Sequence, residues 1–298
     1  MKSSVKKLIC LILAAFILMT GFWINPISGK AATGGIKTLT VKKTYKSWDI
    51  DQDGAKDKFV IKVTKNQYGI VENAKLFVNG KCKYTYAYTL HNPVEIEAYM
   101  IELETGDHLI LIRAVGDDNW GPQRILAWSK EKNKLINIFN ITYAAGIADY
   151  GYLLIAKPTG VSLNKINFVF TQYNNICGSC EFSYEYKYEA GKMKRVSNLG
   201  KLLNIYIANY KTMEDEATKY LIAARSIKVY KKPGSTASSN YQQTIKKNKK
   251  VKFTGIWTNG KQCWLRVTVN GKKGYIKCYK FDSNQTPITY FKDAFFAA

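Results

Sequence analysis

Residues 263–278 read CWLRVTVNGKKGYIKC, and this stretch decides the fold that we expect. An Asn-Gly pair flanked by alternating apolar residues is the strongest short-range signal for a two-residue β-hairpin. A turn at Asn270-Gly271 places Cys263 opposite Cys278 on the two strands. We therefore expect a cross-strand disulfide, with two buried thiols as the alternative.

Short strands separated by turn signals fill the chain before this hairpin. The turn signals are Asn79-Gly80 and residues 105–107, 130–133 and 190–192. Their spacing of about 8–12 residues predicts an antiparallel β domain, built as a meander, a sandwich or a partial propeller. The expected strands are residues 38–45, 59–64, 75–78, 83–90, 95–103, 108–114, 124–128, 135–141, 166–172 and 181–188.

Residues 212–224 are ambiguous between a short capped helix and the start of a second β domain. We place the domain boundary just before this segment.

The first 31 residues have the layout of a secretory signal peptide. Lys2, Lys6 and Lys7 precede an uncharged run over residues 8–28, and Gly29 and Ala31 supply the small residues of a cleavage site. The expected location is therefore secreted or extracellular. A retained membrane anchor is the alternative, because residues 8–27 are nearly long enough to span a bilayer.

Positive charge is concentrated near the C-terminus. The 298-residue chain has a formal net charge of +23, and residues 225–280 hold 15 Lys and Arg without one Asp or Glu. Such a field attracts polyanions without specifying which one, so it predicts an anionic wall polymer and no specific nucleic acid. A basic surface that only maintains solubility is the alternative.

The sharpest motif is DIDQDGAKD at residues 49–57. Carboxylates at positions 1, 3, 5 and 9, with glycine at position 6, can surround a hard cation, and the carbonyl of residue 7 adds another oxygen. We expect a structural calcium ion, with a solvated acidic turn as the alternative. The expected ligands are Asp49, Asp51, Asp53, Ala55 and Asp57.

Residues 40–200 loosely resemble the FG-GAP and VCBS-like β domains of extracellular bacterial proteins. The resemblance depends on the acidic loop, on the strand at 59–63 that follows it, on LFVNG at 76–80 and on the hairpin at 186–195. It implies a calcium loop between strands.

Cys177-Gly-Ser-Cys180 is a CxxC between two expected strands. A redox pair usually opens a helix, and a zinc site usually needs a second ligand pair. A small structural disulfide is therefore the favoured state.

Residues 216–282 resemble bacterial SH3-like domains. The matching segments are IKVY at 227–230 with KPGST at 232–236, TIKKNKKVKFTG at 244–255, and the hairpin at 264–276. The resemblance implies a small C-terminal β-barrel of the kind that binds peptidoglycan peptides or other envelope polymers without catalysis. It also implies a binding groove formed by Tyr230, Tyr241, Trp257 and Tyr279.

These observations give a mainly β protein in four parts: a signal peptide (1–31), a β-rich domain (32–211), an SH3-like domain (212–282) and a tail (283–298). No nucleophile–base motif is recognisable, since neither His91 nor His108 lies in one. We expect a secreted, non-catalytic, envelope-associated protein that binds cell-wall peptidoglycan or an anionic wall polymer. It would contact a membrane only if the signal peptide is retained. The alternative is a wall hydrolase or redox protein that uses the SH3-like domain for targeting.

Overall fold

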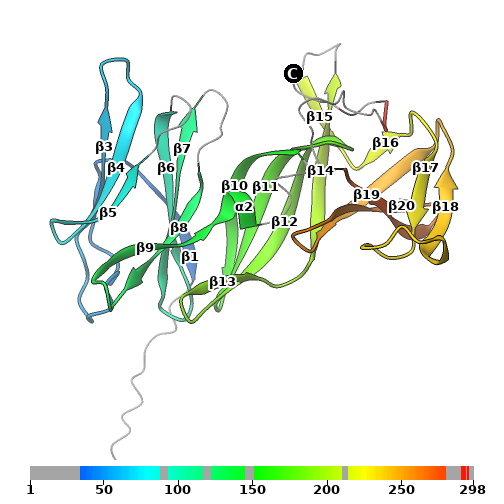
Figure 1. Cartoon of the computed structure of the whole chain (residues 1–298). Coiled ribbons are helices and arrows are strands. Elements are labelled where there is room, and N and C mark those ends of the chain that lie inside the picture. Colours follow the sequence, from blue (N-terminus) through cyan, green and yellow to red (C-terminus); the bar gives the residue numbers. More distant parts are fainter. Residues whose placement is uncertain are drawn as a thin grey trace, which may run out of the picture. The chain divides into compact units, whose positions relative to one another are not determined.

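The computed structural model describes residues 34–87, 93–116, 122–144, 151–209, 214–279, 290–292 and 294, and nearly all of them lie in β-strands or the turns between them (Figure 1). The predicted β-rich fold is confirmed. Within these ranges the helical pieces are single turns, α2 (Ile141–Ala144) and η2 (Ser238–Asn240). No helix there is long and apolar enough to cross a membrane. The predicted signal peptide lies outside the described residues.

Two antiparallel sheets form the first part of the described chain. They share a core to which Leu76, Met100 and Ile112 contribute completely buried side chains. The four-stranded sheet consists of β2 (Thr44–Tyr45), β3 (Phe59–Lys65), β4 (Val71–Val78) and β5 (Lys81–Ala87). The five-stranded sheet consists of β1 (Gly35–Leu39), β6 (Pro93–Glu102), β7 (His108–Gly116), β8 (Arg124–Ser129) and β9 (Lys134–Asn140).

A third sheet continues through the rest of the chain. Its main path is β10 (Gly151–Ser162), β11 (Lys165–Asn174), β12 (Gly178–Glu189), β14 (Leu199–Asn209), β19 (Lys250–Thr258), β20 (Cys263–Val269), β21 (Lys272–Lys277), β17 (Ile227–Tyr230) and β18 (Tyr241–Ile245). Three further strands pair beside this path: β13 (Lys192–Arg195), β15 (Glu214–Thr218) and β16 (Tyr220–Ile222).

Both faces of strand β7 are buried, because apolar residues follow one another along it. Ile110 and Ile112 belong to the core shared with the four-stranded sheet. Leu109 and Leu111 belong to a second core, which also contains Phe168 and residues of the C-terminal strands. The five-stranded sheet therefore packs against apolar side chains on each side.

The expected hairpin at residues 263–278 is confirmed in its turn and its register. Asn270 and Gly271 have φ angles of 49° and 75°, the left-handed pair that a type I′ turn requires. Trp264 pairs with Lys277, and the Cys278 amide donates to the Cys263 carbonyl oxygen at 2.9 Å.

Three sequence predictions about strands were wrong or incomplete. Residues 38–45 form two strands in different sheets, because Lys42 adopts a φ of 66° and the Lys43 amide donates to the Thr40 carbonyl oxygen. The ambiguous segment at 212–224 contains β15 and β16 in its described part and no helix there. Strands β10 and β14 were not predicted at all.

Strand β14 joins the two halves of the third sheet, because it pairs with both β12 and β19. The approach is close: a Cβ atom on Gly255 would lie 2.7 Å from the carbonyl oxygen of Gly200. Backbone contacts group residues 33–298 in one compact unit. The domain boundary expected near residue 212 stays a prediction, and strand pairing crosses it through β14 and β15.

Part of the expected C-terminal tail completes the second core. Phe291 is completely buried and packs edge-on against Phe253, with ring centroids 5.1 Å apart. The backbone around it pairs with the residues after β16, since Ala224 N–H donates to Tyr290 O and Lys292 N–H donates to Ile222 O, each at 2.9 Å. This tail segment is therefore part of the sheet.

Substitution of Gly200 by alanine is expected to lower the free energy of unfolding by about 1–3 kcal/mol, the usual cost of overpacking a tight site. The new methyl group would lie 2.7 Å from the Ser183 carbonyl oxygen and 2.8 Å from the Tyr184 ring. That ring cannot move freely, because its hydroxyl donates to the Ile256 carbonyl oxygen at 2.8 Å. Urea unfolding of the purified variant measures the effect.

Gly160→Ala is the matched control, since a Cβ atom there has no neighbour within 4 Å. Its free energy of unfolding should stay within about 0.5 kcal/mol of the parent protein. Equal losses in the two variants would show that the contact of Gly200 with β12 is not tight.

Candidate functional site

The acidic loop occupies the connection between β2 and β3. Gly54 adopts a φ of 95°, as position 6 of the motif requires, and Gln52 also takes the left-handed conformation with a φ of 58°. The loop closes at its base, where the Asp57 amide donates to the Trp48 carbonyl oxygen at 2.6 Å. Nine residues thus fold back on themselves without regular secondary structure.

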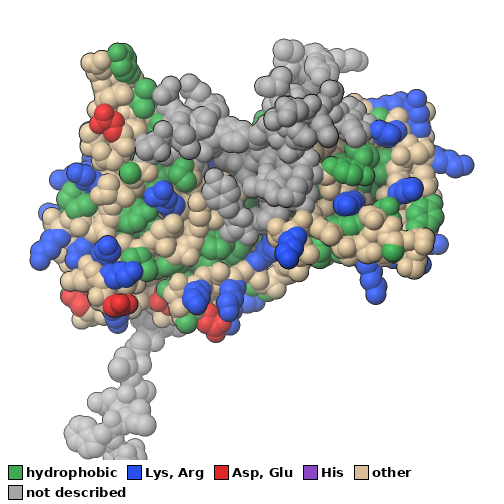
Figure 2. Space-filling view, in the orientation of Figure 1, with side chains coloured by type: hydrophobic (Ala, Val, Ile, Leu, Met, Phe, Trp, Pro, Cys, Tyr) green, Lys and Arg blue, Asp and Glu red, His purple; other side chains and the backbone are tan. Residues whose placement is uncertain are grey.

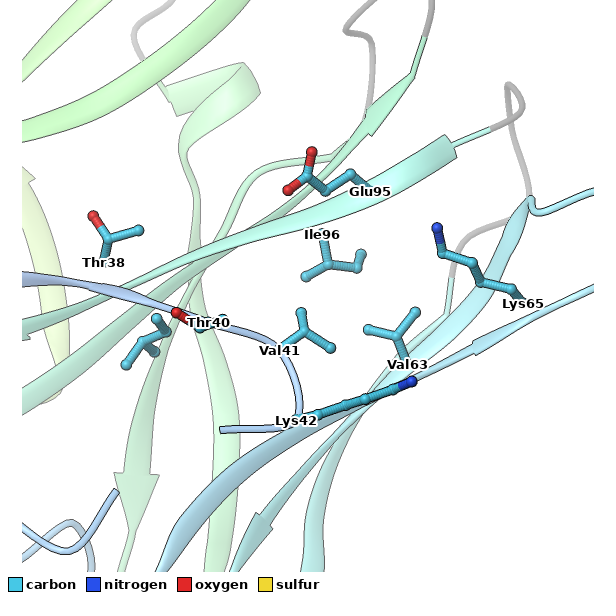
Figure 3. Close-up of a pocket in the computed structure, with 9 residues that line it drawn as sticks. Thr38, Thr40, Val41, Lys42, Val63, Lys65, Glu95 and Ile96 are labelled. Atoms are coloured by element: carbon cyan, nitrogen blue, oxygen red, sulfur yellow. The ribbon is translucent and has the colours of Figure 1, made fainter. Parts of the chain in front are cut away.

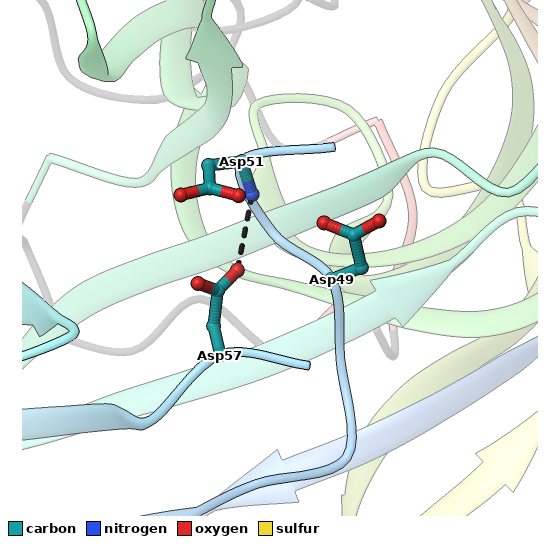
Figure 4. A group of neighbouring side chains, drawn as sticks. All are labelled: Asp49, Asp51 and Asp57. Atoms are coloured by element: carbon teal, nitrogen blue, oxygen red, sulfur yellow. Dashed lines mark hydrogen bonds between the residues drawn. The ribbon is translucent and has the colours of Figure 1, made fainter. Parts of the chain in front are cut away.

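Three of the predicted ligands come together in this loop (Figure 4). Asp49, Asp51 and Asp57 each offer a carboxylate oxygen, and these oxygens lie within 4.8 Å of one another. This group can hold a metal ion. Asp53 is not part of this carboxylate group, and its carboxylate accepts a hydrogen bond from the Ala55 amide at 2.8 Å. The Ala55 carbonyl oxygen stays a predicted ligand.

Hydrogen bonds from the backbone hold two of these carboxylates in place. Asp57 is almost completely buried, and its Oδ2 accepts from the amides of Ile50 at 2.6 Å and Asp51 at 3.1 Å. Its Oδ1 accepts from the side-chain amide of Asn79, at the turn between β4 and β5. Asp49 accepts from the amides of residues 53 and 54, both at 3.0 Å. The loop therefore presents a fixed set of oxygens.

Of the three carboxylates, that of Asp51 has the fewest hydrogen bonds to offset its negative charge. Its Oδ1 is shielded from solvent and has no hydrogen-bond partner among the described residues. Burial raises the pKa of Asp51 above its usual value, and the nearby carboxylates of Asp57 and Asp53 raise it further. A bound cation would offset this accumulation of negative charge.

Contacts from the five-stranded sheet also hold the acidic loop. Trp48 Nε1 donates to Glu102 Oε1 at 2.7 Å, and Gln52 Nε2 donates to Asp107 Oδ1 at 3.2 Å. His108 hydrogen-bonds the backbone of Asp49, and burial lowers the pKa of His108. No local motif indicates this role for His108, because the contact joins residues that are far apart in the sequence. The loop thus connects the two sheets of the first core.

The cysteines lie where the sequence placed them, but neither predicted disulfide is present. All five described cysteines are free thiols, including the buried pairs Cys177 with Cys180 and Cys263 with Cys278. The thiols of each pair are in hydrogen-bond contact. Contact with Cys177 and burial raise the pKa of Cys180, and burial and Cys263 raise that of Cys278. Since the thiolate is the reactive form, these thiols are poorly set up for disulfide exchange.

The four residues of the expected binding groove differ in exposure and surroundings, and the groove stays a prediction. Tyr230 is 9% exposed and packs edge-on against Trp264. Tyr279, 51% exposed, lines the same small cavity as Tyr230, whereas Tyr241 and Trp257 are not among its lining residues. Trp257 pairs instead with Leu199 of β14, at the junction of the third sheet.

Basic side chains cover the exposed positions of the C-terminal strands. Figure 2 shows several Lys and Arg side chains over the region of β17 and β18, and no acidic side chain is visible among them in this view. Tyr220, itself 40% exposed, lies between two lysines whose ammonium groups are 4.7 and 5.6 Å from its ring centroid. The exposed lysines of this region include Lys228, Lys231, Lys232, Lys246, Lys247, Lys249, Lys250, Lys252, Lys272 and Lys273.

A cavity of about 660 Å³ opens where β1, β3 and β6 meet (Figure 3). Val41, Val63 and Ile96 form its apolar centre, and Lys65 and Glu95 also line it. Its described lining contains neither histidine nor cysteine. Its lining residues therefore offer no catalytic pair based on histidine or cysteine.

Comparisons with known proteins do not place this chain in a family. A scan against models of protein families finds no match, and a search of curated proteins finds no related sequence. The resemblances to FG-GAP, VCBS-like and SH3-like domains stay predictions. What the chain does is therefore inferred from its own residues.

Proposed function

We propose that this protein is an exported, non-catalytic binding protein of the cell envelope, and that its basic C-terminal part holds peptidoglycan or an anionic wall polymer. The observation that carries the proposal is the row of exposed lysines on β17 to β21 and their turns. Residues 225–280 contain no carboxylate that could neutralise them. A polymer with repeated negative charges would gain attraction at each of these positions.

Other features of the C-terminal part support a binding role. The strand order β19-β20-β21-β17-β18 and the confirmed final hairpin agree with the SH3-like barrel that the resemblance implies. The raised pKa values of the buried Cys180 and Cys278 thiols speak against the redox alternative. Tyr220 and Tyr241 remain exposed among the lysines and offer flat surfaces for sugar or peptide groups.

The proposal includes a structural calcium ion in the acidic loop, bound by Asp49, Asp51 and Asp57. Calcium prefers carboxylate and carbonyl oxygens in a flexible geometry, and this loop supplies three carboxylates close together. An ion there would stabilise the contact between the two sheets that the loop connects. Calcium would thus support the fold rather than the binding surface.

Calcium is expected to raise the melting temperature of chelator-treated protein. At a free concentration 100 times the dissociation constant, binding to the folded state contributes about 2.7 kcal/mol, equivalent to about 5–10 °C for a chain of this size. Asp51→Asn should abolish most of this response. The same variant should melt about 2–4 °C higher than the parent without calcium, because it relieves like-charge repulsion worth about 1 kcal/mol. Differential scanning calorimetry measures both effects.

Asp53→Asn is the matched control, since it removes the same charge from the same loop outside the carboxylate group. It should keep most of the calcium response. A melting temperature that calcium leaves unchanged in the parent protein would refute the calcium site, and an equal loss in both variants would restore Asp53 as a ligand.

Retention of residues 32–298 on purified cell walls is expected to depend on the lysines of the β18–β19 turn. Replacing Lys246, Lys247 and Lys249 with glutamine removes three exposed charges without touching the core. Retention at low salt should fall clearly in this variant. For the parent protein, about 1 M salt should release most of the bound material, because the Debye length shrinks to about 3 Å. Co-sedimentation with walls, with and without their anionic polymer, measures the effect.

In a second triple variant, glutamine replaces Lys42, Lys56 and Lys58. This variant has the same change of charge, at exposed positions in the two-sheet part that encloses the first core. It should be retained like the parent. No retention of the parent on either type of wall would refute the envelope-binding role, and equal losses in both variants would assign binding to total charge alone.

A further inference from the structure

A small cavity of about 160 Å³ lies where four segments of the C-terminal part meet. We call it the Arg225 pocket. Its lining comes from β17 and the two residues before it, from Thr236 in the loop after β17, from the end of β21 and from the tail. Its charged and aromatic lining residues are Arg225, Lys228, Lys277, Tyr230, Tyr279 and Tyr290.

The charge of the Arg225 pocket has one sign. One arginine and two lysines line it, and no acidic residue is among its described lining. Arginine presents a planar fork of N–H donors that suits the oxygens of phosphate and carboxylate groups. The side chains of Ser226 and Thr236 add hydroxyl groups. The cavity therefore offers donors and positive charge to an anion.

The aromatic walls of the pocket are fixed before any ligand arrives. Tyr279 and Tyr290 are stacked, with centroids 5.9 Å apart and planes at 19°, and the Arg225 guanidinium lies 5.7 Å from the Tyr290 ring centroid. Asn175 Nδ2 donates to the Tyr279 carbonyl oxygen at 3.1 Å, and the backbone pairing around Phe291 holds Tyr290. Such pre-organisation lowers the entropic cost of binding.

We propose that the Arg225 pocket binds one phosphate group esterified to a polyol or sugar. A volume near 160 Å³ equals about five water molecules at ~30 Å³ each, enough for a phosphate and a few carbon atoms. Three cations match a phosphate monoester, which carries up to two negative charges on three oxygens, better than a carboxylate, which carries one negative charge on two oxygens. The stacked tyrosines provide an apolar face for the carbon part. This deepens the proposed envelope binding and rests on it for its biological setting.

Calorimetric titration of residues 32–298 with glycerol 3-phosphate at low ionic strength tests the pocket. Saturable binding at one site per chain is expected. Arg225→Gln and Lys228→Gln should each weaken it about tenfold or more, the loss expected for one charge-assisted hydrogen bond. Lys192→Gln removes the same charge from an exposed position outside the lining and outside the lysines of β17 to β21, and it should change the affinity less than about twofold. Circular dichroism and melting temperatures verify that each variant is folded.

Three outcomes would overturn the pocket: no saturable binding, equal weakening by Lys192→Gln, or tighter binding of acetate or a dialanine peptide than of the phosphate ester. Phosphatidylglycerol vesicles and purified wall polymer, tested as competitors, identify the source of the phosphate. Wall retention without glycerol 3-phosphate binding would refute the phosphate pocket and leave the proposed function standing. Glycerol 3-phosphate binding without wall retention would support the pocket and refute the proposed function.

Discussion

The close pairing of β14 with β19 is the contact on which the rest of the structure depends. It is made by backbone against backbone at Gly200 and Gly255, where a side chain on Gly255 would meet the Gly200 carbonyl oxygen and push the strands apart. Through it the strands from β10 to β14 and the strands from β16 to β21 form one sheet. Their apolar faces consequently merge into one core, which also covers one face of the five-stranded sheet. Hydrophobic burial thus acts across the chain as a whole.

Clear turn signals bound most of the strands that sequence reasoning found, although β4 and β6 among them also carry β-bulges. The strands it missed, β10 and β14, carry β-bulges as well, and each bulge shifts the alternation. In β14, Leu203 is the extra residue beside the partners Glu181 and Phe182. In β10, the register shifts twice, between Leu153 and Ile155 and between Pro158 and Gly160. Bulges depend on the neighbouring strand, so the local sequence does not announce them.

The candidate metal site was predictable to the extent that it is local. The spacing of the motif alone predicted that Asp49, Asp51 and Asp57 lie close together, because residues two and eight positions apart can meet inside a tight loop. Spacing could not show that Asp53 would bind its own loop backbone instead. The C-terminal pocket is the opposite case, because Arg225 and Tyr290 become neighbours only through the pairing of the tail. Long-range contacts of that kind follow from the fold and not from a motif.

The burial of Phe291 and the pairing of β14 with β19 limit which segments of this chain could be exchanged with other proteins during evolution. Many envelope proteins are assembled from self-contained segments that recombine between genes as interchangeable cassettes. Here, a break near residue 212 would expose the backbone edge of β19 where β14 now pairs, and would open the core shared by Leu202, Ile205 and Ile256. A transplanted C-terminal piece would have to bring β14 and the Phe291 segment with it. The smallest segment that could be transferred and still fold is therefore larger than the lysine-rich surface. The residues of the binding surface and those of the core are expected to have diverged together.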